Sequence, residues 1–312
     1  MGGCHHPRIL KGGGRTAVSI FSVGGLQLEL AAADNVAELI GEIRSAKGRY
    51  PWLDMVMLPE LASFGTRTAH AVRLPGAVER RYCEVARELR IWLLPGSLYE
   101  RRGAHIFNTA PLIDPAGRVV ARYRKIFPWT PYERGVTAGD GFVVTRAGGA
   151  SLGISICYDA WFPETTRSLA WLGAEVILHP TLTNSIDRDV ELAIARATAA
   201  AQQCYYLDIN LAGPLGAGRS VVCGPGGEVI HQAGTAREVI AVQLDLDYLR
   251  RCRALGWHGL GQPLKSFRDC ALRFPCYRPQ RRAAPALERL GAVRMAAAGT
   301  AAADRRRRRS RN

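Results

Sequence analysis

The segment GISICYDAWFPE carries a single cysteine, Cys157, at the end of a hydrophobic run that is typical of a β-strand. A thiol acts as a nucleophile when it can become a thiolate, when donors stabilise the oxyanion that its attack creates, and when a rigid element presents it. The strand supplies that element, and Pro163 suits the first turn of a helix directly after it. Backbone N–H groups just after Cys157 could then face a developing anion. Because an isolated cysteine at a strand end is more often a small core residue, this interpretation depends on partners.

Two charged residues that follow other apolar segments are candidate partners for this thiol. Glu60 ends the run LDMVMLPE, where a buried carboxylate costs on the order of several kcal/mol unless it is paired. Lys125 lies in RYRKIFPWTPYE among aromatic residues and prolines, and Glu133 closes that segment. Each of these residues could instead be a solvated surface charge or part of a loop surface. Because α/β layers build sites at the carboxyl ends of their strands, we expect Glu60, Lys125 and Cys157 to meet at one sheet edge.

Strand-like and helix-like segments alternate along the chain and favour an α/β or layered α+β domain. Strands are expected at TAVSIFSV, LDMVML, IWLLPGS, FNTAPLI, RVVARY, FVVTRAG, SLGISIC, EVILHP, CYYLDIN, SVVC, VIHQA and AVQLDLD. Asp34 is the expected N-cap of the first helix. The apolar residues of that helix share one face through their spacing, at Val36, Leu39, Ile40 and Ile43. Further helices are expected near residues 78–90, 163–172 and 188–203.

The chain divides into four segments. Residues 1–14 are expected to form a loose or disordered N-terminus, and residues 15–247 a folded domain. Residues 248–277 include GLGQPLKSFRD, which has no clear periodicity, and we expect an extended arm there. Residues 278–312 contain alanine runs and the block RRRRRSR, a composition that cannot form a packed core and is expected to be disordered.

The formal net charge of +15 is concentrated at the C-terminus. Residues 278–312 account for +9 of it, because eleven arginines face only Glu288 and Asp304. Such a tail is most often a solvated appendage, and binding to nucleic acid or acidic surfaces without specificity is the alternative. We therefore expect no specific nucleic-acid partner.

Cysteine spacing and hydropathy indicate the compartment and exclude some kinds of site. The eight cysteines form no CxxC pair and no compact framework, which favours reduced thiols in a cytosol. Cys270 and Cys276 lack a matching His or Cys pair for zinc. The N-terminus has no apolar core of a secretory signal, and no apolar run reaches the roughly 18 residues of a membrane span. We expect a cytoplasmic protein without metal, cofactor or membrane segment.

Three blocks of the sequence resemble the signature of the nitrilase, or carbon-nitrogen hydrolase, superfamily. They are LPELASFG around Glu60, RKIFPWTPYERG around Lys125 and ISICYDAWFPE around Cys157, in the order and spacing of that family. The resemblance covers about residues 16–247 and is specific, because it rests on three separate blocks. It implies that these three residues are the catalytic glutamate, lysine and cysteine, and that Glu133 is the family's second glutamate. It also implies a four-layer α-β-β-α sandwich, usually dimerised, whose C-terminal arm could exchange between subunits.

The chemistry that the resemblance implies is hydrolysis of a small amide through a thioester. Glu60 would act as general base for the Cys157 thiol, while Lys125 and the backbone N–H of Tyr158 would hold the oxyanion. Protonated Glu60 would then deliver its proton to the leaving amine, which gives ammonia and an acyl-enzyme. Water activated by the same carboxylate would release the acid. Glu133 would orient Lys125 or the substrate.

Other residues near the cysteine have less distinctive patterns. Trp161 and Phe162 are expected to line the substrate pocket, although aromatic residues after a strand are as often core. Asp159 is expected to hydrogen-bond within its own turn. His179 is expected in the core or behind the site, because Glu60 already supplies a base.

The nucleophile triplet separates the possible substrates only in part. Cys157, Tyr158 and Asp159 differ from the Cys-Trp-Glu of true nitrilases and look more like the amidase branches. Hydrolysis of a small aliphatic or amino-acid-derived amide is therefore the first interpretation. An N-carbamoyl-amine hydrolase or a nitrilase is second, since WFPE is shared with some carbamoyl-amine hydrolases. A catalytically silent member, or one that the basic tail recruits to a polyanion, is an alternative of a different class.

Overall fold

The computed structural model describes residues 19–277, 285–293 and 295 of the 312-residue chain. The expected loose N-terminus, residues 1–14, lies outside these residues, and so does most of the basic tail. Within the tail, Pro285–Glu288 forms the short helix α7. In the part of the chain that the structure describes, no helix is both long enough and apolar enough to cross a bilayer.

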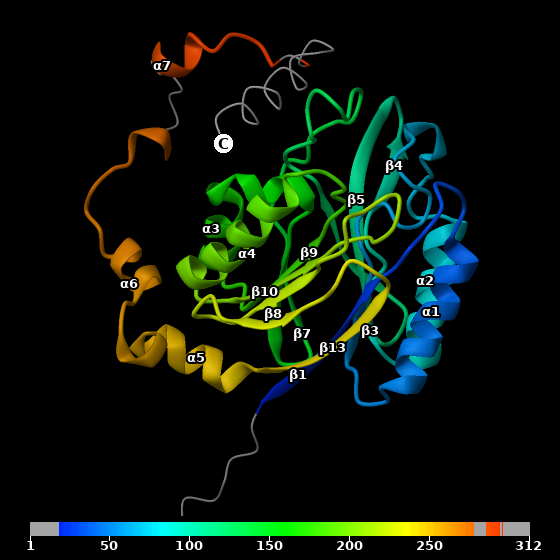
Figure 1. The fold of residues 1–312 in the computed structure, drawn as a ribbon, viewed down its shortest axis with the longest axis horizontal. Coiled ribbons are helices and arrows are strands. Elements are labelled where there is room, and N and C mark those ends of the chain that lie inside the picture. The colour runs from blue at the N-terminus through cyan, green and yellow to red at the C-terminus, as the bar shows by residue number, and fades with distance from the viewer. Residues whose placement is uncertain (1–18, 278–284, 294, 296–312) are drawn as a thin grey trace, which may run out of the picture.

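Two β-sheets lie between two pairs of helices (Figure 1). Helices α1 (Val36–Arg49) and α2 (Ala77–Leu89) cover the outer face of one sheet. Helices α3 (Pro163–Trp171) and α4 (Arg188–Gln202) cover the outer face of the other. The expected four-layer α-β-β-α sandwich is confirmed.

The first sheet has seven strands in the order β13-β1-β2-β3-β5-β4, with β6 paired to β5. Their bounds are β1 Ile20–Gln27, β2 Met55–Met57, β3 Trp92–Leu94, β4 Leu98–Arg102, β5 His105–Ile113, β6 Val119–Arg124 and β13 Glu238–Asp245. Strands β1, β2 and β3 are parallel, so their carboxyl ends share one edge of the sheet. The strand expected at TAVSIFSV is β1, and residues 16–18 of that segment lie outside the described residues.

The second sheet has six strands in the order β12-β11-β10-β9-β8-β7. Their bounds are β7 Val144–Ala147, β8 Ala150–Ile154, β9 Val176–Pro180, β10 Tyr205–Ile209, β11 Val221–Cys223 and β12 Val229–Gln232. Strands β8, β9 and β10 are parallel. The hairpin expected around GPGGE joins β11 and β12, which are antiparallel.

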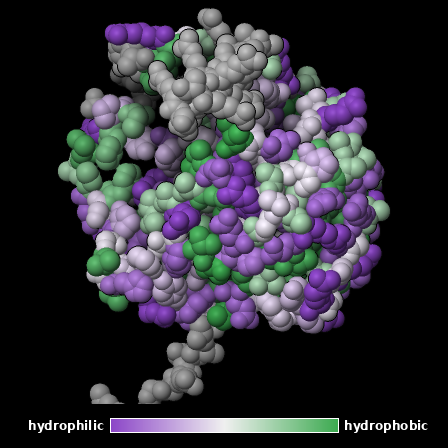
Figure 2. Space-filling model, viewed as in Figure 1, coloured by the Kyte–Doolittle hydropathy of each residue, from purple (hydrophilic) through white to green (hydrophobic). Residues whose placement is uncertain are grey.

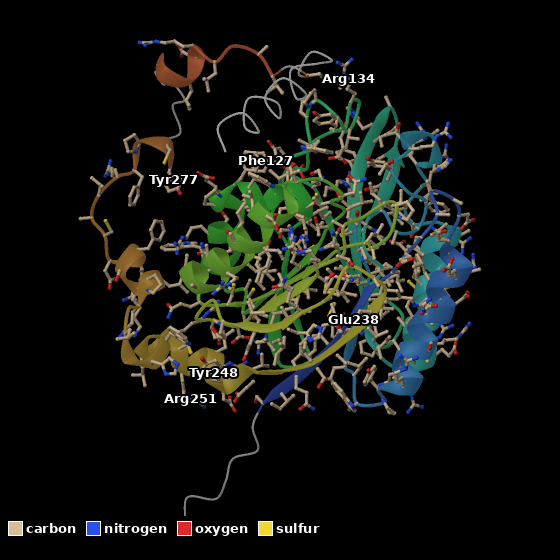
Figure 3. The ribbon with its side chains drawn as sticks, viewed as in Figure 1. Phe127, Arg134, Glu238, Tyr248, Arg251 and Tyr277 are labelled. Carbon is tan, nitrogen blue, oxygen red and sulfur yellow. The ribbon has the colours of Figure 1, made fainter. Side chains whose placement is uncertain are left out.

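Successive side chains of the short strands point to opposite faces of each sheet. Met55 and Met57 of β2 face the core between the two sheets, whereas Val56 packs towards α1 and α2. The same period of two places Ile177 of β9 against α3 and α4, and its neighbours Val176 and Leu178 between the sheets. Side chains fill the space between the layers throughout (Figure 3).

Helix α1 forms as its apolar spacing predicts. The four expected residues Val36, Leu39, Ile40 and Ile43 are buried against the first sheet. The carboxylate of Asp34 accepts a hydrogen bond from the backbone N–H of Val36 at 3.0 Å, although the cap position itself falls on Asn35. Asp34 therefore stabilises the start of the helix from the position before the N-cap residue, Asn35.

Two elements differ from the sequence-based expectation. Strand β4 was not expected, because the charges of LYERR hide its pattern, yet it pairs with β5 along its whole length. The extended conformation expected for residues 248–277 is wrong in part, since α5 (Leu246–Leu255) and α6 (Pro263–Arg268) form there. Asp245 caps α5 by accepting from the backbone N–H of Tyr248 at 2.7 Å. The domain boundary at residue 247 stays a prediction.

The segment after β13 runs along the outer side of α3 and α4, where Tyr248 and Tyr277 mark its course (Figure 3). Phe267 of α6 meets Trp171 of α3 edge-on, with ring centroids 5.8 Å apart. On the face shown in Figure 2, hydrophobic side chains are scattered among hydrophilic ones over most of the surface. Exchange of this segment between subunits stays a prediction.

Candidate active site

Glu60 lies just beyond β2, at the edge where the parallel strands of the first sheet end. Its side chain is buried, with 3% of the residue exposed, and its backbone N–H donates to the carbonyl of Thr181 at 3.3 Å. Gly96 passes so close to this segment that a Cβ there would lie 1.8 Å from the carbonyl oxygen of Pro59. The loop after β3 can therefore pack against the Glu60 segment only because residue 96 has no side chain.

Lys125 follows β6 and is the cation of the site. Its Nζ lies 2.9 Å from Oε1 of Glu60 and 2.8 Å from Oε2 of Glu133, and only 1% of the residue is exposed. The backbone N–H of Lys125 donates to the carbonyl of Asn108 on β5 at 2.9 Å. The structure thus brings three sequence-predicted residues, Glu60, Lys125 and Glu133, into one hydrogen-bonded group.

Two residues of this group were missed by sequence reasoning. The amide of Asn108 donates to Oε1 of Glu60 at 2.8 Å and to Oε1 of Glu133 at 3.2 Å. The hydroxyl of Tyr99 donates to the same Glu133 oxygen at 3.1 Å. A polar residue inside the apolar strand FNTAPLI was the available signal for Asn108, because a buried amide needs partners.

Cys157 begins a short 3-10 helix, Cys157–Trp161, directly after β8. Its φ is +45°, in the left-handed region that a residue with a Cβ rarely adopts. Such strain clusters at functional sites, where the surrounding structure holds it in place. The half-buried side chain packs against the core between the sheets.

Asp159 fixes the turn that carries this cysteine. Its Oδ2 accepts from the backbone N–H of Ile156 at 2.9 Å, the hydrogen bond within the turn that the sequence predicts. The same oxygen accepts from the Tyr123 hydroxyl at 2.7 Å, and Oδ1 accepts from the backbone N–H of Phe127 at 2.9 Å. Asp159 therefore ties the Cys157 turn to the segment on either side of Lys125.

The charges of the site act on one another because they are buried. Desolvation raises the pKa of Glu60, and the neighbouring Lys125 ammonium opposes that rise. Desolvation would lower the pKa of Lys125, but its acidic neighbours, with Glu60 first among them, raise it well above its usual value. The lysine is therefore held as an ammonium, and the glutamate has gained basicity.

The pKa of the Cys157 thiol is raised, whereas the pKa of the second glutamate, Glu133, is lowered. Desolvation and the carboxylate of Glu60 raise the pKa of Cys157 well above its usual value. Desolvation acts upward on Glu133 too, but Lys125 and its other donors leave the pKa of that carboxyl lowered. The resting site then holds a neutral thiol, and Glu133 is ionised. A thiol of this kind needs a base at the moment of attack.

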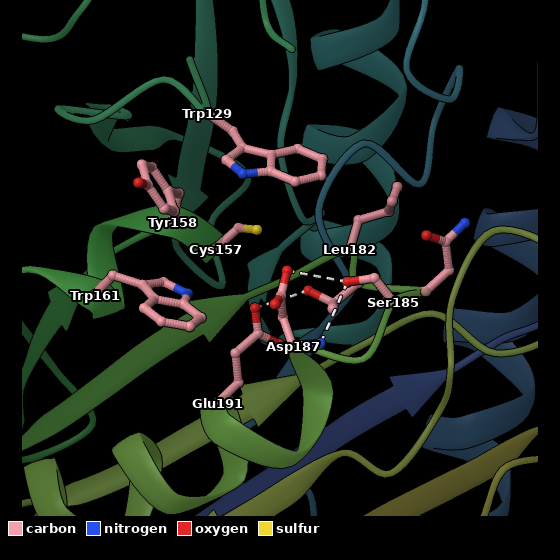
Figure 4. Close-up of a pocket in the computed structure, with 10 residues that line it drawn as sticks. Trp129, Cys157, Tyr158, Trp161, Leu182, Ser185, Asp187 and Glu191 are labelled. Carbon is pink, nitrogen blue, oxygen red and sulfur yellow. Dashed lines mark hydrogen bonds between the residues drawn. The ribbon is translucent and has the colours of Figure 1, made fainter. Parts of the chain in front are cut away.

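A cavity of about 270 Å³ opens in front of the cysteine (Figure 4). Its lining comprises Trp129, Cys157, Tyr158, Trp161, Leu182, Thr183, Asn184, Ser185, Asp187 and Glu191. Trp161 lines the cavity as the sequence predicts. The expectation for Phe162 is wrong, because its ring stacks on Phe127 with centroids 3.6 Å apart. Consecutive side chains after the Cys157 turn point in different directions, and only the first of the two aromatic rings faces the cavity.

His179 lies behind the site, as expected. It is buried on β9, and its Nδ1 is 2.8 Å from the hydroxyl of Ser155. Desolvation lowers the pKa of this imidazole to about 4. At neutral pH the ring is therefore uncharged, and its position within the strand gives it a packing role.

The chain matches a known family along most of its length. The sequence profile described as carbon-nitrogen hydrolase matches residues 22–254. A formamidase of Bacillus cereus (strain Q1) is 29% identical over 236 residues, which are 71% of this chain and 70% of the relative. A formamidase of Bacillus thuringiensis (strain Al Hakam) is 28% identical over 256 residues, or 78% of this chain and 76% of the relative.

Solved structures share the fold. Nit3 of Saccharomyces cerevisiae, a member of branch 10 of the nitrilase superfamily, has a TM-score of 0.70 at 23% identity and covers 76% of this chain and 94% of its own. An amidase of Nesterenkonia sp. AN1 has a TM-score of 0.68 at 27% identity and covers 78% of this chain and 97% of its own. In that amidase structure, the acetamide moiety of fluoroacetamide is covalently added at the active-site cysteine.

Proposed function

The chain belongs to the carbon-nitrogen hydrolase family, and on that premise we propose that it is a cysteine-dependent amidase. Its substrate is a small linear amide, and its products are ammonia and a carboxylic acid. The observation that carries the proposal is the buried Lys125 ammonium, 2.9 Å from Glu60 and 2.8 Å from Glu133. Besides desolvation, both Glu60 and Lys125 act on the pKa of Cys157, a cysteine held at positive φ. The formamidase and amidase relatives support the same chemistry.

In the first step, Sγ of Cys157 attacks the amide carbonyl carbon while Glu60 accepts the thiol proton. The raised pKa values of both groups suit this transfer, because the thiol stays protonated in the resting site and the neighbouring Glu60 is a stronger base than an ordinary carboxylate. The carbonyl π electrons move to the oxygen. The product of this step is a tetrahedral oxyanion bonded to sulfur.

The oxyanion is stabilised by Nζ of Lys125 and the backbone N–H of Tyr158. Lys125 is suited to this role because Glu60, Glu133 and burial hold its ammonium in one position before substrate arrives. A preorganised donor of this kind contributes about 3 kcal/mol to transition-state stability. Glu133 is thus a positioning residue, and Asn108 supports it by donating to both carboxylates.

Collapse of the oxyanion breaks the C–N bond. Protonated Glu60 gives its proton to the departing nitrogen, which leaves as ammonia, and the acyl group remains on Cys157 as a thioester. A water molecule then attacks the thioester carbonyl as Glu60 takes one of its protons. Breakdown of this second tetrahedral species returns the proton to sulfur and releases the acid.

The decisive experiment measures ammonia release and acyl transfer together. Purified protein is incubated with formamide, butyramide, an N-carbamoyl amine and an aliphatic nitrile, and the intact mass of quenched enzyme is recorded. We expect the mass of the wild-type enzyme to increase by one acyl group in place of the thiol hydrogen. The Cys157→Ala variant should show no such adduct. Cys83→Ala is the matched control, because Cys83 is also a partly buried free thiol but lies on α2, outside the residues that line the cavity.

Each other outcome assigns a different function. Turnover of only the carbamoyl compound or only the nitrile would replace the amidase proposal with the corresponding branch of the family. Unchanged ammonia release in Cys157→Ala would overturn the cysteine mechanism. No turnover of any compound would favour a catalytically silent member.

We further propose that the enzyme works as a homodimer in the cytoplasm. Trp171 and Leu172 at the end of α3 are 60% and 56% exposed, which favours burial of this helix end by a second copy. The cysteines of the described residues are free thiols, as in a reducing compartment.

A further inference from the structure

Two carboxylates line the cavity that contains the Cys157 thiol. Asp187 and Glu191 lie at the start of α4, and Figure 4 shows both projecting towards the space in front of the cysteine sulfur. Glu191 is a buried residue, with 8% of its surface exposed. Among the described residues that line this cavity there is no lysine or arginine side chain, and the Lys125 ammonium is already paired with Glu60 and Glu133.

The buried charges around Glu191 do not sum to zero. Arg188 contacts Oε2 of Glu191 at 3.2 Å and Oδ2 of Asp208 at 2.9 Å, so one guanidinium faces two carboxylates. Oε1 of Glu191 accepts from the Thr183 hydroxyl at 3.0 Å, which aims the carboxylate along the cavity wall. Desolvation and Asp208 raise the pKa of Glu191, and a cation in the cavity would oppose both effects.

Aromatic rings complete the surroundings that a cation prefers. Trp129, Tyr158 and Trp161 line the same cavity, and Figure 4 shows the two indoles at its borders. The faces of such rings attract an ammonium or guanidinium group within about 6 Å of the ring centroid. Carboxylates and aromatic rings therefore act in the same direction on a charged ligand.

The cavity is also larger than the simplest amide requires. A space of about 15 Å³ holds one water molecule. The cavity of about 270 Å³ thus has room for a chain well beyond the three heavy atoms of formamide. The carboxylates can be reached by a substituent at the far end of a short acyl chain whose amide carbon lies at Cys157.

We propose that Asp187 and Glu191 select amides whose short acyl chain ends in a cationic group, such as a primary ammonium. This inference rests on the proposed amidase function and names its substrate class. The competing explanation is that acidic residues at the start of α4 only offset the positive end of the helix dipole. Asp189 separates the two explanations, because it lies in the same helical turn, is 75% exposed and pairs with Arg219 away from the cavity.

The test compares three amides that differ only in the terminal group. γ-Aminobutyramide carries an ammonium, valeramide has a methyl group in the same place, and glutaramate has a carboxylate. We expect kcat/KM for γ-aminobutyramide to exceed that for valeramide by about tenfold, or about 1.4 kcal/mol. Glutaramate should be the poorest substrate. Asp187→Asn should reduce the preference about threefold, as expected for a partly exposed charge pair.

Two further variants connect the preference to the cavity. Glu191→Gln should reduce the ratio of the two kcat/KM values by about tenfold, since the ammonium would lose a desolvated partner. Asp189→Asn should leave the ratio unchanged, although it removes the same charge from the same helix. A ratio near one in the wild-type protein, or an equal effect of Asp187→Asn and Asp189→Asn, would overturn the proposal.

A binding measurement keeps this inference distinct from the amidase function. Cys157→Ala is titrated with γ-aminobutyramide and with valeramide in a calorimeter. Tighter binding of the cationic amide, weakened by Asp187→Asn in the same background, supports the proposal even where turnover fails. Equal binding of the two amides contradicts it even where both are hydrolysed.

Discussion

At the scale of single residues, Glu60 has the most demanding task in the proposed mechanism, where it accepts and donates a proton in both halves of the reaction. Glu60→Gln keeps the shape of the side chain and its contact with Lys125 but cannot accept the thiol proton. We expect kcat to fall roughly 10²–10⁴-fold, the usual contribution of a general base. The measurement is ammonia release under saturating amide. Glu88→Gln, a change in an exposed ion pair with Arg44, is the control and should leave the rate unchanged.

Asn108 sets how strongly the two glutamates repel each other. Asn108→Asp would replace a donor to both carboxylates with a third negative charge, which raises the pKa of Glu60 further. The proposed mechanism requires ionised Glu60, so the acid limb of kcat/KM should move to higher pH. A pH–rate profile measures the shift. An acid limb at the same pH, or at a lower one, would contradict the role assigned to Asn108, and a melting curve monitors folding.

At the scale of elements, the site depends on close approach between the loop after β3 and the segment after β2. Gly96→Ala would force a Cβ into the carbonyl of Pro59 and strain a residue whose φ is +70°. We expect a loss of about 2–5 kcal/mol in the free energy of unfolding, together with lower kcat from displaced Glu60. Denaturant titration and initial rates measure the two effects.

Gly103→Ala is the matched control for that substitution. Its φ is +60°, but a Cβ there meets no other atom within 4 Å. The control should therefore lose only about 1–2 kcal/mol, the cost of the left-handed backbone. Equal losses in the two variants would show that the approach to Pro59 has no energetic weight.

The strand ends explain how much of the site could be predicted from the sequence. Glu60 and Cys157 follow the apolar strands β2 and β8, which belong to two different sheets, and Lys125 follows β6, which is antiparallel to β5. Their positions at strand ends could be predicted from the sequence. The expectation that they meet at the edge of one sheet is wrong, because the site is assembled from both sheets. Asn108 and Tyr99 could not be assigned in this way, because they lie within strands and their partners come from another part of the sheet. The two carboxylates at the start of α4 were missed for a similar reason. Only the packing of that helix turns Asp187 and Glu191 towards the cysteine.

Local patterns also account for the errors in the fold. The layers and nearly all strands follow from period-two alternation and buried runs. Strand β4 was not predicted from the sequence, because pairing with β5, rather than apolar content, stabilises it. Helix α5 was hidden by its many charges, although Leu246, Leu249 and Cys252 form a buried face at helical spacing.

At the scale of the whole molecule, the exposed C-terminal end of α3, at Trp171 and Leu172, determines the expected assembly. A dimer that covers Leu172 should have twice the mass of one chain in light scattering. Leu172→Glu would place a charge in that contact and should shift the population towards monomer. Trp52→Glu, a change of another exposed apolar residue before β2, is the control. A wild-type protein that is monomeric at micromolar concentration would contradict this assembly.

The uneven charge of the chain leads to a separate expectation for the tail. Removal of residues 278–312 takes away +9 of the +15 net charge and should weaken retention on heparin at low salt. Amide turnover should be unchanged, since the residues assigned to the site lie before position 192. Retained heparin binding, or lost turnover, would contradict an accessory role for the tail.

The left-handed backbone of Cys157 affects how this protein would respond to laboratory evolution. Glycine holds a φ of +45° without the steric penalty of about 1–2 kcal/mol that a Cβ brings. A library selected only for heat resistance should therefore be drawn towards glycine at position 157 and become inert. Selection for thermostability in this enzyme has to be coupled to a screen for turnover at every round.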